Sequence, residues 1–420
     1  MKYTSVRGMD DILPQHSSTW QEIESKAREI FSSYGYNEIR TPILEKTEVF
    51  SRGIGEGTDI VSKEMYTFQD RKGRSLTLRP EGTAPIVRSY IQNSLSQISL
   101  DMRLFYIGPM FRSERPQKGR SRQFHQIGSE LIGPDSPYAD AEIIIQMNKL
   151  LKEVGIQDFD MQINSLGCKK DKEMFSQKLK SYLKGKENGL CEDCSRRIDK
   201  NVLRVLDCKN DKCKEIVENA PDVSSCYCQE CVSHFETMQK LLNKMEVKFR
   251  INKKLVRGLD YYTKTVFEVS HKGLGSQDAI GAGGRYNNLV KDLGGPDVGA
   301  VGYAIGMERM LLAVVKDMHK KNKKKISLIS LGDKAKAQAF QLAEDIRDAF
   351  NIPVLCDLRD GSLKTQLRNA DKQNVDLVLI IGENEIEKGI ILVRDMNSKQ
   401  QIEVPVDIIL DDIKQRITEF

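Results

Sequence analysis

A run of lysines after residue 318 is the feature that most constrains how this chain can fold. The seven residues from His319 to Lys325 include five lysines, whose like charges repel one another and cannot pack in a core. We therefore expect residues 319–325 to form an exposed basic linker. It divides a chain of 420 residues, which is long enough for about two or three domains with separate cores.

The part after this linker alternates between two patterns. Apolar runs typical of strands occur at Ile326–Leu331, Ile352–Cys356 and Asp376–Ile381, and apolar residues at helical spacing lie between them. This alternation is typical of a parallel α/β unit. We expect residues 326–420 to form a separate α/β domain.

The part before the linker has β-prone runs in pairs. Arg103–Arg112 and Gln123–Ile132 flank a long polar loop, which predicts a hairpin of antiparallel strands. Residues 168–250 interrupt this pattern, because they are rich in Lys, Asp and Cys and contain helix-like segments with few β-branched runs. We therefore expect an α+β core on an antiparallel sheet, formed by residues 1–167 and 251–318, with residues 168–250 as a helical, Cys-rich insertion.

Seven of the nine cysteines crowd between residues 191 and 231. The chain begins with charged residues where a signal peptide would need an apolar stretch, so we expect a cytoplasmic protein with reduced thiols. The spacings Cys191-x2-Cys194 and Cys228-x2-Cys231 are compatible with tetrahedral zinc, for which thiolates are preferred ligands. A structural zinc site would use these four residues. The alternative is a small helical core packed with reduced thiols.

The net charge of +5 is too small for a general nucleic-acid coat, but the charge is unevenly placed. Residues 112–122 carry five basic side chains against Glu114 alone, a local balance of +4. Arginine contacts phosphate oxygens by paired hydrogen bonds, so this loop suits a phosphate-bearing ligand, with a solvated hairpin tip as the alternative. Apolar stretches such as Val375–Gly382 are far shorter than the roughly 20 residues of a membrane helix, so we expect no membrane contact.

Taken together and in order, several segments resemble the class II aminoacyl-tRNA synthetases, and within them the histidyl-tRNA synthetase family. Gly35–Phe50, with its Arg-Thr-Pro sequence, is similar to motif 1, Phe111–Arg112 to motif 2 and Gly302–Arg309 to motif 3. Leu255–Tyr262 and Ala282–Tyr286 resemble two stretches peculiar to the histidine enzymes. The resemblance covers essentially the whole chain.

The resemblance implies a ligase that joins histidine to tRNA. In such an enzyme the carboxylate of histidine attacks the α-phosphate of ATP, pyrophosphate leaves, and the histidyl group passes from the adenylate to the terminal ribose of histidine tRNA. It also implies ATP used with Mg²⁺, a homodimer formed through motif 1, and an anticodon-binding role for residues 326–420. Chemistry of this kind asks the protein mainly for positioning and for positive charge around the reacting phosphorus.

The resemblance also implies roles for single residues. Arg112 would hold the α-phosphate, Arg309 the γ-phosphate, and Phe124 would stack on adenine, with Glu114 as a further ATP contact. Arg257 would lie at the α-phosphate and the carboxylate, where a fixed cation stabilises the charge that develops in the transition state. Arg112 and Arg257 are therefore the expected catalytic residues.

Recognition of histidine and of tRNA is implied for further residues. A buried carboxylate that accepts from a ring N–H discriminates against substrates that lack that donor. Arg115 and Gln117 occupy positions where the family contacts the acceptor end of tRNA. The residues that resemble the family's histidine contacts are Glu130 and Tyr262 for the imidazole, Glu81, Thr83 and Gln126 for the amino group, and Tyr261 and Tyr286 close by.

Two other functions share parts of this pattern. The same fold serves as a non-catalytic, histidine-sensing regulatory subunit of the first enzyme of histidine biosynthesis, and a generic ATP-dependent amidating enzyme could use a synthetase core. The regulator is expected to lack Arg257, Arg309, the intact basic loop or the C-terminal domain, and the amidating enzyme has no need of a tRNA-reading domain. All these features are present in the sequence, so we favour the ligase.

Overall fold

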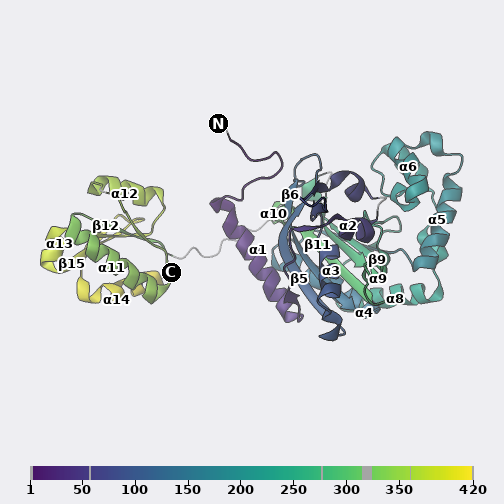
Figure 1. Cartoon of the computed structure of the whole chain (residues 1–420). Helices are drawn as coiled ribbons and strands as arrows, with labels where there is room; N and C mark the ends of the chain where they lie inside the picture. Colours follow the sequence, from purple (N-terminus) through teal and green to yellow (C-terminus); the bar gives the residue numbers. More distant parts are fainter. Residues whose placement is uncertain (1–2, 56–57, 276–277, 315–323, 360, 419–420) are drawn as a thin grey trace. The chain divides into compact units, whose positions relative to one another are not determined.

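The computed structural model describes residues 3–55, 58–275, 278–314, 324–359 and 361–418. It separates the chain into two compact units, Met1–Met318 and His319–Phe420 (Figure 1). Residues 319–323 of the expected basic linker lie outside the described residues. Each unit has a sheet and a hydrophobic core of its own.

The first unit is built on an eight-stranded sheet. Its strands, in spatial order, are β1 (Asn37–Glu38), β5 (Met102–Phe111), β6 (Gln123–Gly133), β11 (Gly299–Gly306), β10 (Ala279–Arg285), β9 (Thr263–Ser270), β7 (Asp160–Ser165) and β8 (Arg250–Ile251). The central strands from β5 to β7 pair antiparallel, which confirms the predicted antiparallel sheet. The two short edge strands, β1 and β8, pair parallel with their neighbours, so the sheet is mixed at its edges.

The hairpin of β5 and β6 carries the basic loop. Its register runs from Met102 opposite Ile132 to Phe111 opposite Gln123, so the loop begins where the strand pairing ends. Beside this sheet lies a small antiparallel sheet with the order β2 (Leu44–Lys46), β4 (Ser75–Leu78), β3 (Tyr66–Gln69).

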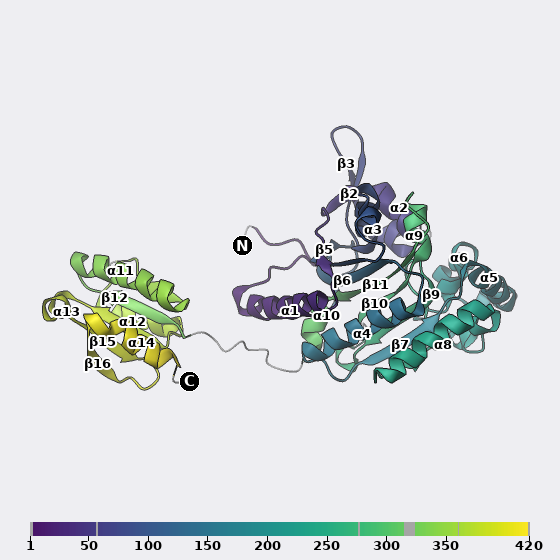
Figure 2. The same ribbon diagram turned by 90° about the horizontal axis from the view of Figure 1, so that it is seen from below.

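Helices cover both faces of the large sheet, as Figure 2 shows. On one face, α1 (Pro14–Ser33), α4 (Pro137–Glu153) and α10 (Met307–Ala313) pack in one core. On the other face lie α2 (Thr47–Ile54), α3 (Thr83–Gln92) and α9 (Asn287–Asp292), in a second core. Side chains alternate along a strand, so in β5 Phe105 joins the first core while its neighbours Leu104 and Tyr106 join the second.

The segment between β7 and β8 is helical. It contains α5 (Lys169–Leu183), α6 (Glu192–Lys200), α7 (Asp211–Glu218) and α8 (Gln229–Lys244). Residues 168–249 are all described, and within them no residue is in a strand. Helix α8 packs in the first core beside α4, whereas α5, α6 and α7 pack in the second core.

A buried ionic network joins this helical segment to the sheet. The carboxylate of Asp140 on α4 accepts hydrogen bonds from Arg285 Nε of β10 at 2.8 Å and lies 2.7 Å from His234 Nε2 of α8. Asp140 and Arg285 are both fully buried. Burial alone would raise the pKa of Asp140. The charge of Arg285 and the contact with His234 outweigh burial and lower this pKa to about 2. The carboxylate therefore stays ionised and holds three elements together.

The second unit has a five-stranded sheet with helices on both faces. Its spatial order is β13 (Val354–Cys356), β12 (Ile326–Ser330), β14 (Leu377–Ile381), β15 (Ile390–Asp395) and β16 (Gln401–Pro405). Strand β12 pairs parallel with β13 and β14, as predicted, but β15 and β16 add an antiparallel hairpin that the sequence analysis missed. The helices are α11 (Asp333–Phe350), α12 (Leu363–Lys372), α13 (Glu383–Lys388) and α14 (Ile409–Thr418). Helices α11 and α14 pack in one core and α12 in another.

Across the described parts of both units, no helix has the length and apolar sequence needed to cross a membrane.

Candidate active site

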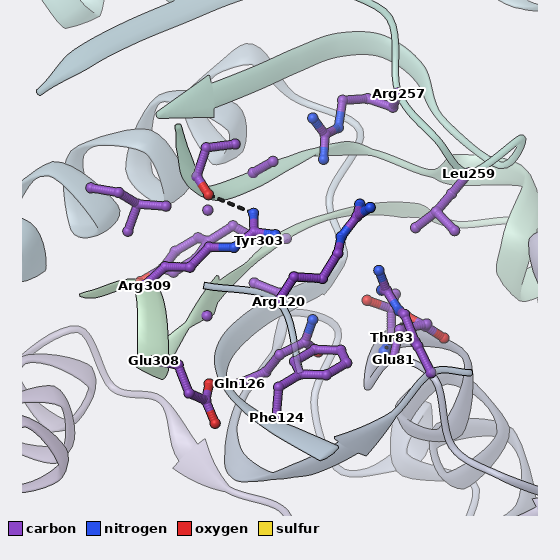
Figure 3. A pocket seen from close by; sticks show the side chains of 18 of the residues that line it. Glu81, Thr83, Arg120, Phe124, Gln126, Arg257, Leu259, Tyr303, Glu308 and Arg309 are labelled. Atoms are coloured by element: carbon purple, nitrogen blue, oxygen red, sulfur yellow. Dashed lines mark hydrogen bonds between the residues drawn. The ribbon is translucent and has the colours of Figure 1, made fainter. Parts of the chain in front are cut away.

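A pocket of the first unit brings together most of the residues that the sequence analysis singled out (Figure 3). It lies where β4 leads into α3, beside the β5–β6 loop, over strands β6, β10 and β11, and against the start of α10. The predicted residues that line it are Glu81, Thr83, Arg112, Glu114, Phe124, Gln126, Arg257, Tyr261, Tyr262, Tyr286 and Arg309.

One part of this pocket combines carboxylates with tyrosines. Glu81 precedes α3, and its carboxylate accepts from the backbone N–H groups of Thr83 and Ala84 at 2.8 and 2.9 Å. Burial raises the pKa of Glu81, and these hydrogen bonds act against that rise. The ring of Tyr261 contacts those of Tyr262 and Tyr286, with centroid distances of 4.6 and 5.7 Å. Three aromatic rings and a buried carboxylate suit a small, planar, hydrogen-bonding substrate group.

Glu130 lies beneath this part of the pocket and does not line it. Its carboxylate accepts from Thr83 Oγ1 at 2.7 Å and from the hydroxyl of Tyr286 at 2.5 Å. Burial raises the pKa of Glu130 to about 8, although both hydrogen bonds favour the charged form. Gly302 of β11 lies over the same carboxylate, where any Cβ would overlap Glu130 Oε2, so only glycine fits there. Glu130 therefore fixes the two hydroxyl groups that border the pocket.

Arginines form the other part of the pocket. Arg112 Nε donates to the carbonyl of Pro80 at 2.9 Å, and its guanidinium lies 5.2 Å from the ring centre of Phe124. Arg309 donates to the carbonyls of Gly119 and Ala279 at 2.8 and 2.7 Å. Burial, with the nearby charges of Arg120 and Arg112, lowers the pKa of Arg309. Such mutual repulsion marks a region of positive potential that an anion would relieve.

Carboxylates pair with three of the four arginines that line the pocket. Glu114 is buried and pairs with Arg120, and it lies 3.8 Å from Arg112, so part of the positive charge expected of the basic loop is matched within the loop. Arg257 is paired with Glu268 of β9. In the described structure Arg309 forms no ion pair, since both of its hydrogen bonds go to backbone carbonyls. Its charge is thus the one in the pocket without a carboxylate partner among these residues.

Two predicted residues of the basic loop lie away from the pocket. Arg115 and Gln117 are exposed, and the backbone of Gln117 pairs with that of Arg120 in the loop's own tight turn. Sequence reasoning gave no individual role to Arg120, Tyr303 or Glu308, all of which line the pocket. Arg120 belongs to the basic loop, and the other two belong to the stretch that resembles motif 3, so their positions carried a signal.

The four cysteines predicted to hold one metal do not lie together. Cys191 and Cys194 lie with Cys208 and Cys213, whereas Cys228 and Cys231 lie with Cys168 and Asp171. The predicted set of Cys191, Cys194, Cys228 and Cys231 is therefore wrong. The reason is that one pair begins α6 and the other begins α8, and these helices pack in different cores.

Comparisons with known proteins identify the family. A model of the family "Histidyl-tRNA synthetase" matches residues 8–310, and one of "Anticodon binding domain" matches residues 322–416. A curated relative from Thermosipho melanesiensis, "Histidine–tRNA ligase", is 46% identical over 420 residues, which is 99% of this chain and 100% of the relative. A second, from Desulfosudis oleivorans and of the same name, is 47% identical over 96% of this chain and 95% of the relative.

Solved structures agree with this assignment. The structure of apo histidyl-tRNA synthetase from S. aureus is 30% identical, with a TM-score of 0.82 over 98% of this chain and 100% of that chain. A Bacillus halodurans structure described as an ATP phosphoribosyltransferase regulatory subunit/histidyl-tRNA synthetase is 23% identical, with a TM-score of 0.68 over 91% of this chain and 99% of that chain, a likeness of fold alone. With its two-part pocket, and with relatives that match it from end to end, this chain belongs to the histidyl-tRNA synthetase family.

Proposed function

We propose that the pocket of the first unit joins histidine to the AMP part of ATP with release of pyrophosphate, and that the histidyl group then passes to the 3′ end of histidine tRNA with release of AMP. The relatives named "Histidine–tRNA ligase" match nearly the full length of both units, so ligation of histidine to tRNA is the function of this chain. The single observation that carries the residue roles is the pocket itself, which places a carboxylate-and-tyrosine part beside an arginine part.

The arginine part accepts the triphosphate in this proposal, with ATP entering as its magnesium complex. A carboxylate oxygen of histidine forms a bond to the α-phosphorus while the bond to the bridging oxygen breaks, and pyrophosphate leaves with the electron pair. Arg112 and Arg257 neutralise charge at the α-phosphate, and Arg309 holds the γ-phosphate. Because Glu268 fixes Arg257, its cation needs little reorganisation during the reaction.

The adenine base stacks on Phe124. This ring lies on β6 opposite Met110 of β5, one residue away from the strand end that leads to Arg112. Base and α-phosphate therefore meet side chains from the same hairpin. Glu114 orients Arg112 and Arg120, and its direct contact with ATP stays a prediction.

The carboxylate-and-tyrosine part binds histidine. Glu81, Thr83 and Gln126 contact the amino group and Tyr262 contacts the imidazole, while the contact of Glu130 with the imidazole stays a prediction, because Glu130 does not line the pocket. The two oxygens of Glu130 use one hydrogen bond each on Thr83 and Tyr286, and a carboxylate has about four acceptor sites, so it can still accept from a ring N–H. Tyr261 and Tyr286 close the space around the ring. A substrate without a ring N–H would leave this further acceptor position of the buried carboxylate unfilled.

The remaining partners follow from the same assignment. Arg115 and Gln117 are exposed on the basic loop and contact the acceptor end of the tRNA, and residues 326–420 bind the anticodon. A homodimer forms through the segment Gly35–Phe50, in which Ile43 and Leu44 are 42% and 38% exposed. The enzyme works in the cytoplasm, where its tRNA substrate is charged for protein synthesis.

Exchange of labelled pyrophosphate into ATP tests the first step. We expect exchange only when histidine and Mg²⁺ are both present, because the adenylate must form before pyrophosphate can add back. Other amino acids at the same concentration serve as the control. Binding of histidine without any exchange would contradict the proposal and would favour the non-catalytic, histidine-sensing function.

A further inference from the structure

Four cysteines of the helical segment bring their sulfur atoms together outside the active site. The Sγ atoms of Cys191, Cys194, Cys208 and Cys213 all lie within 4.8 Å of one another. Cys194 and Cys213 are buried, Cys191 and Cys208 are half-buried, and all four are free thiols. The group belongs to no part of the pocket described above.

The sulfur spacing fits a shared metal better than a disulfide. The Sγ atoms of Cys191 and Cys208 are 3.8 Å apart, whereas a disulfide bond is about 2.05 Å long. Zinc bound by thiolates at about 2.3 Å in a tetrahedron requires sulfur atoms about 3.8 Å apart. The observed distance is therefore that of one edge of a zinc tetrahedron.

The local structure presents the four thiols as two pairs. Cys191 and Cys194 begin α6 with the spacing C-x2-C, and Cys208 and Cys213 have the spacing C-x4-C, the second lying in the first turn of α7. The backbone N–H of Cys191 donates to Cys213 Sγ at 3.2 Å, which joins the two pairs. Spacings of two to four residues within a pair are those of structural zinc sites.

We propose that Cys191, Cys194, Cys208 and Cys213 form a structural Zn²⁺ site. Zinc suits the group because it prefers thiolates, takes four ligands and has no redox chemistry. Each thiol that coordinates releases its proton to solvent, so binding becomes tighter as pH rises. The site has no open position for a substrate, so its role is structural.

The second group of potential metal ligands, Cys168, Asp171, Cys228 and Cys231, is less suited to zinc. It offers three thiols and Asp171, whose two carboxylate oxygens already accept from the backbone N–H groups of Cys168 and Cys228 at 3.2 and 3.1 Å. Cys228 is also exposed. Asp171 thus serves as a cap for the starts of α5 and α8, and we assign the metal to the four-cysteine group alone.

The chain between Cys194 and Cys208 contacts the loop that carries Arg257. Arg204 Nη1 donates to the carbonyl of Gly258 at 2.8 Å, and Asn201 donates to the carboxylate of Asp260. Arg204 and Asn201, which hold this loop, therefore lie in a stretch of chain that the metal would fix at both ends, at Cys194 and at Cys208. Loss of zinc should displace Arg257 and slow adenylate formation, and this consequence rests on the proposed function.

Metal content of the full-length protein, purified without added zinc, tests the site. We expect about one equivalent of zinc per chain in the parent protein, loss of that zinc in Cys208→Ser and Cys213→Ser, and its retention in the control Cys228→Ser. Less than about half an equivalent in the parent, even after incubation with zinc and removal of the excess, would overturn the proposal. Loss of zinc in Cys228→Ser together with retention in Cys208→Ser would also overturn it.

Cobalt gives a second test that does not depend on the folding of any variant. Parent protein stripped of metal and loaded with Co²⁺ should show the absorption of a tetrahedral thiolate complex, and its absence would contradict the assignment. Histidine-dependent pyrophosphate exchange should fall on the order of tenfold or more in stripped protein and return with zinc. Because metal content is measured without reference to activity, failure of the site and failure of the proposed function are distinguishable.

Discussion

The buried carboxylate of Glu130 makes the stability of the first unit depend on pH in a way that one substitution should remove. Burial raises the pKa of Glu130 from 4.5 to about 8. Between pH 4.5 and about pH 8, Glu130 keeps a proton in the folded protein that it has lost in the unfolded chain. The stability that this proton supplies is present in full below about pH 4.5 and is lost as pH rises through 8.

The difference between the two pKa values corresponds to a total change of about 5 kcal/mol in the free energy of unfolding. About 2 kcal/mol of this change falls between pH 6 and pH 8. Glu130→Gln keeps the shape of the side chain and one accepting oxygen, replaces the other oxygen by a donating NH2 group, and has no charge to bury. We therefore expect the parent to lose about 2 kcal/mol more than Glu130→Gln when the pH is raised from 6 to 8. Other titrating groups cancel in this difference.

Urea unfolding, followed by tryptophan fluorescence at pH 6 and at pH 8, measures this difference in stability between the parent and Glu130→Gln. The chain has one tryptophan, Trp20, which is buried in α1, so the signal reports on the first unit. Glu153→Gln removes an exposed carboxylate from the end of α4 and serves as the matched control, which should follow the parent. Equal pH dependence in the parent and in Glu130→Gln would refute the reasoning.

Three further substitutions test other parts of the account. Arg257→Ala should abolish histidine-dependent pyrophosphate exchange while weakening histidine binding far less, and exchange near the parental rate would remove Arg257 from its role. Phe124→Leu should raise the KM for ATP about tenfold, with little change in the KM for histidine, because stacking of the base is lost; an unchanged KM for ATP would place the base elsewhere. Asp140→Asn should lower the free energy of unfolding at neutral pH by up to about 3 kcal/mol, because it removes the buried one of the two carboxylates that pair with Arg285 and leaves only Asp135; a urea midpoint equal to that of the parent would count against this network.

The sequence predicted those elements whose pattern is local. The hairpin of β5 and β6 was found because two β-prone runs flank a polar loop, and the parallel strands β12 to β14 because strands and helices alternate. The hairpin of β15 and β16 was missed, although its signal is present in the apolar run Ile390–Val393 and the turn residues Asn397 and Ser398. The alternation of strand-like and helical segments before residue 381 favours a parallel sheet, and this pattern outweighed the local turn signal.

Pairings between distant residues could not be predicted from spacing. Two C-x2-C pairs look equivalent in the sequence, but the fold gives Cys191 and Cys194 the partners Cys208 and Cys213. The sequence likewise shows that Glu114 belongs to the basic loop, but not that its side chain is buried and pairs with Arg112 and Arg120. In both cases the decisive contact depends on how a loop closes, which no periodic pattern records.

The active-site residues were predictable in part: the sequence indicated which residues they are, but not all of their contacts. Their identity came from stretches that resemble family motifs, and the structure brings eleven of them to one pocket. Their depth in the structure was not predictable. Glu130 proved to be a buried partner of Thr83 and Tyr286, because Gly302 lets β11 pass directly over its carboxylate.

Aminoacylation of histidine tRNA by the full-length protein tests the central claim most directly. The tRNA is supplied with and without its extra 5′ guanosine, together with ATP, Mg²⁺ and labelled histidine. We predict that histidine becomes attached to the 3′ end, and that the tRNA with the extra guanosine is charged much faster. No charging of either tRNA, by protein that still binds histidine, would contradict the account.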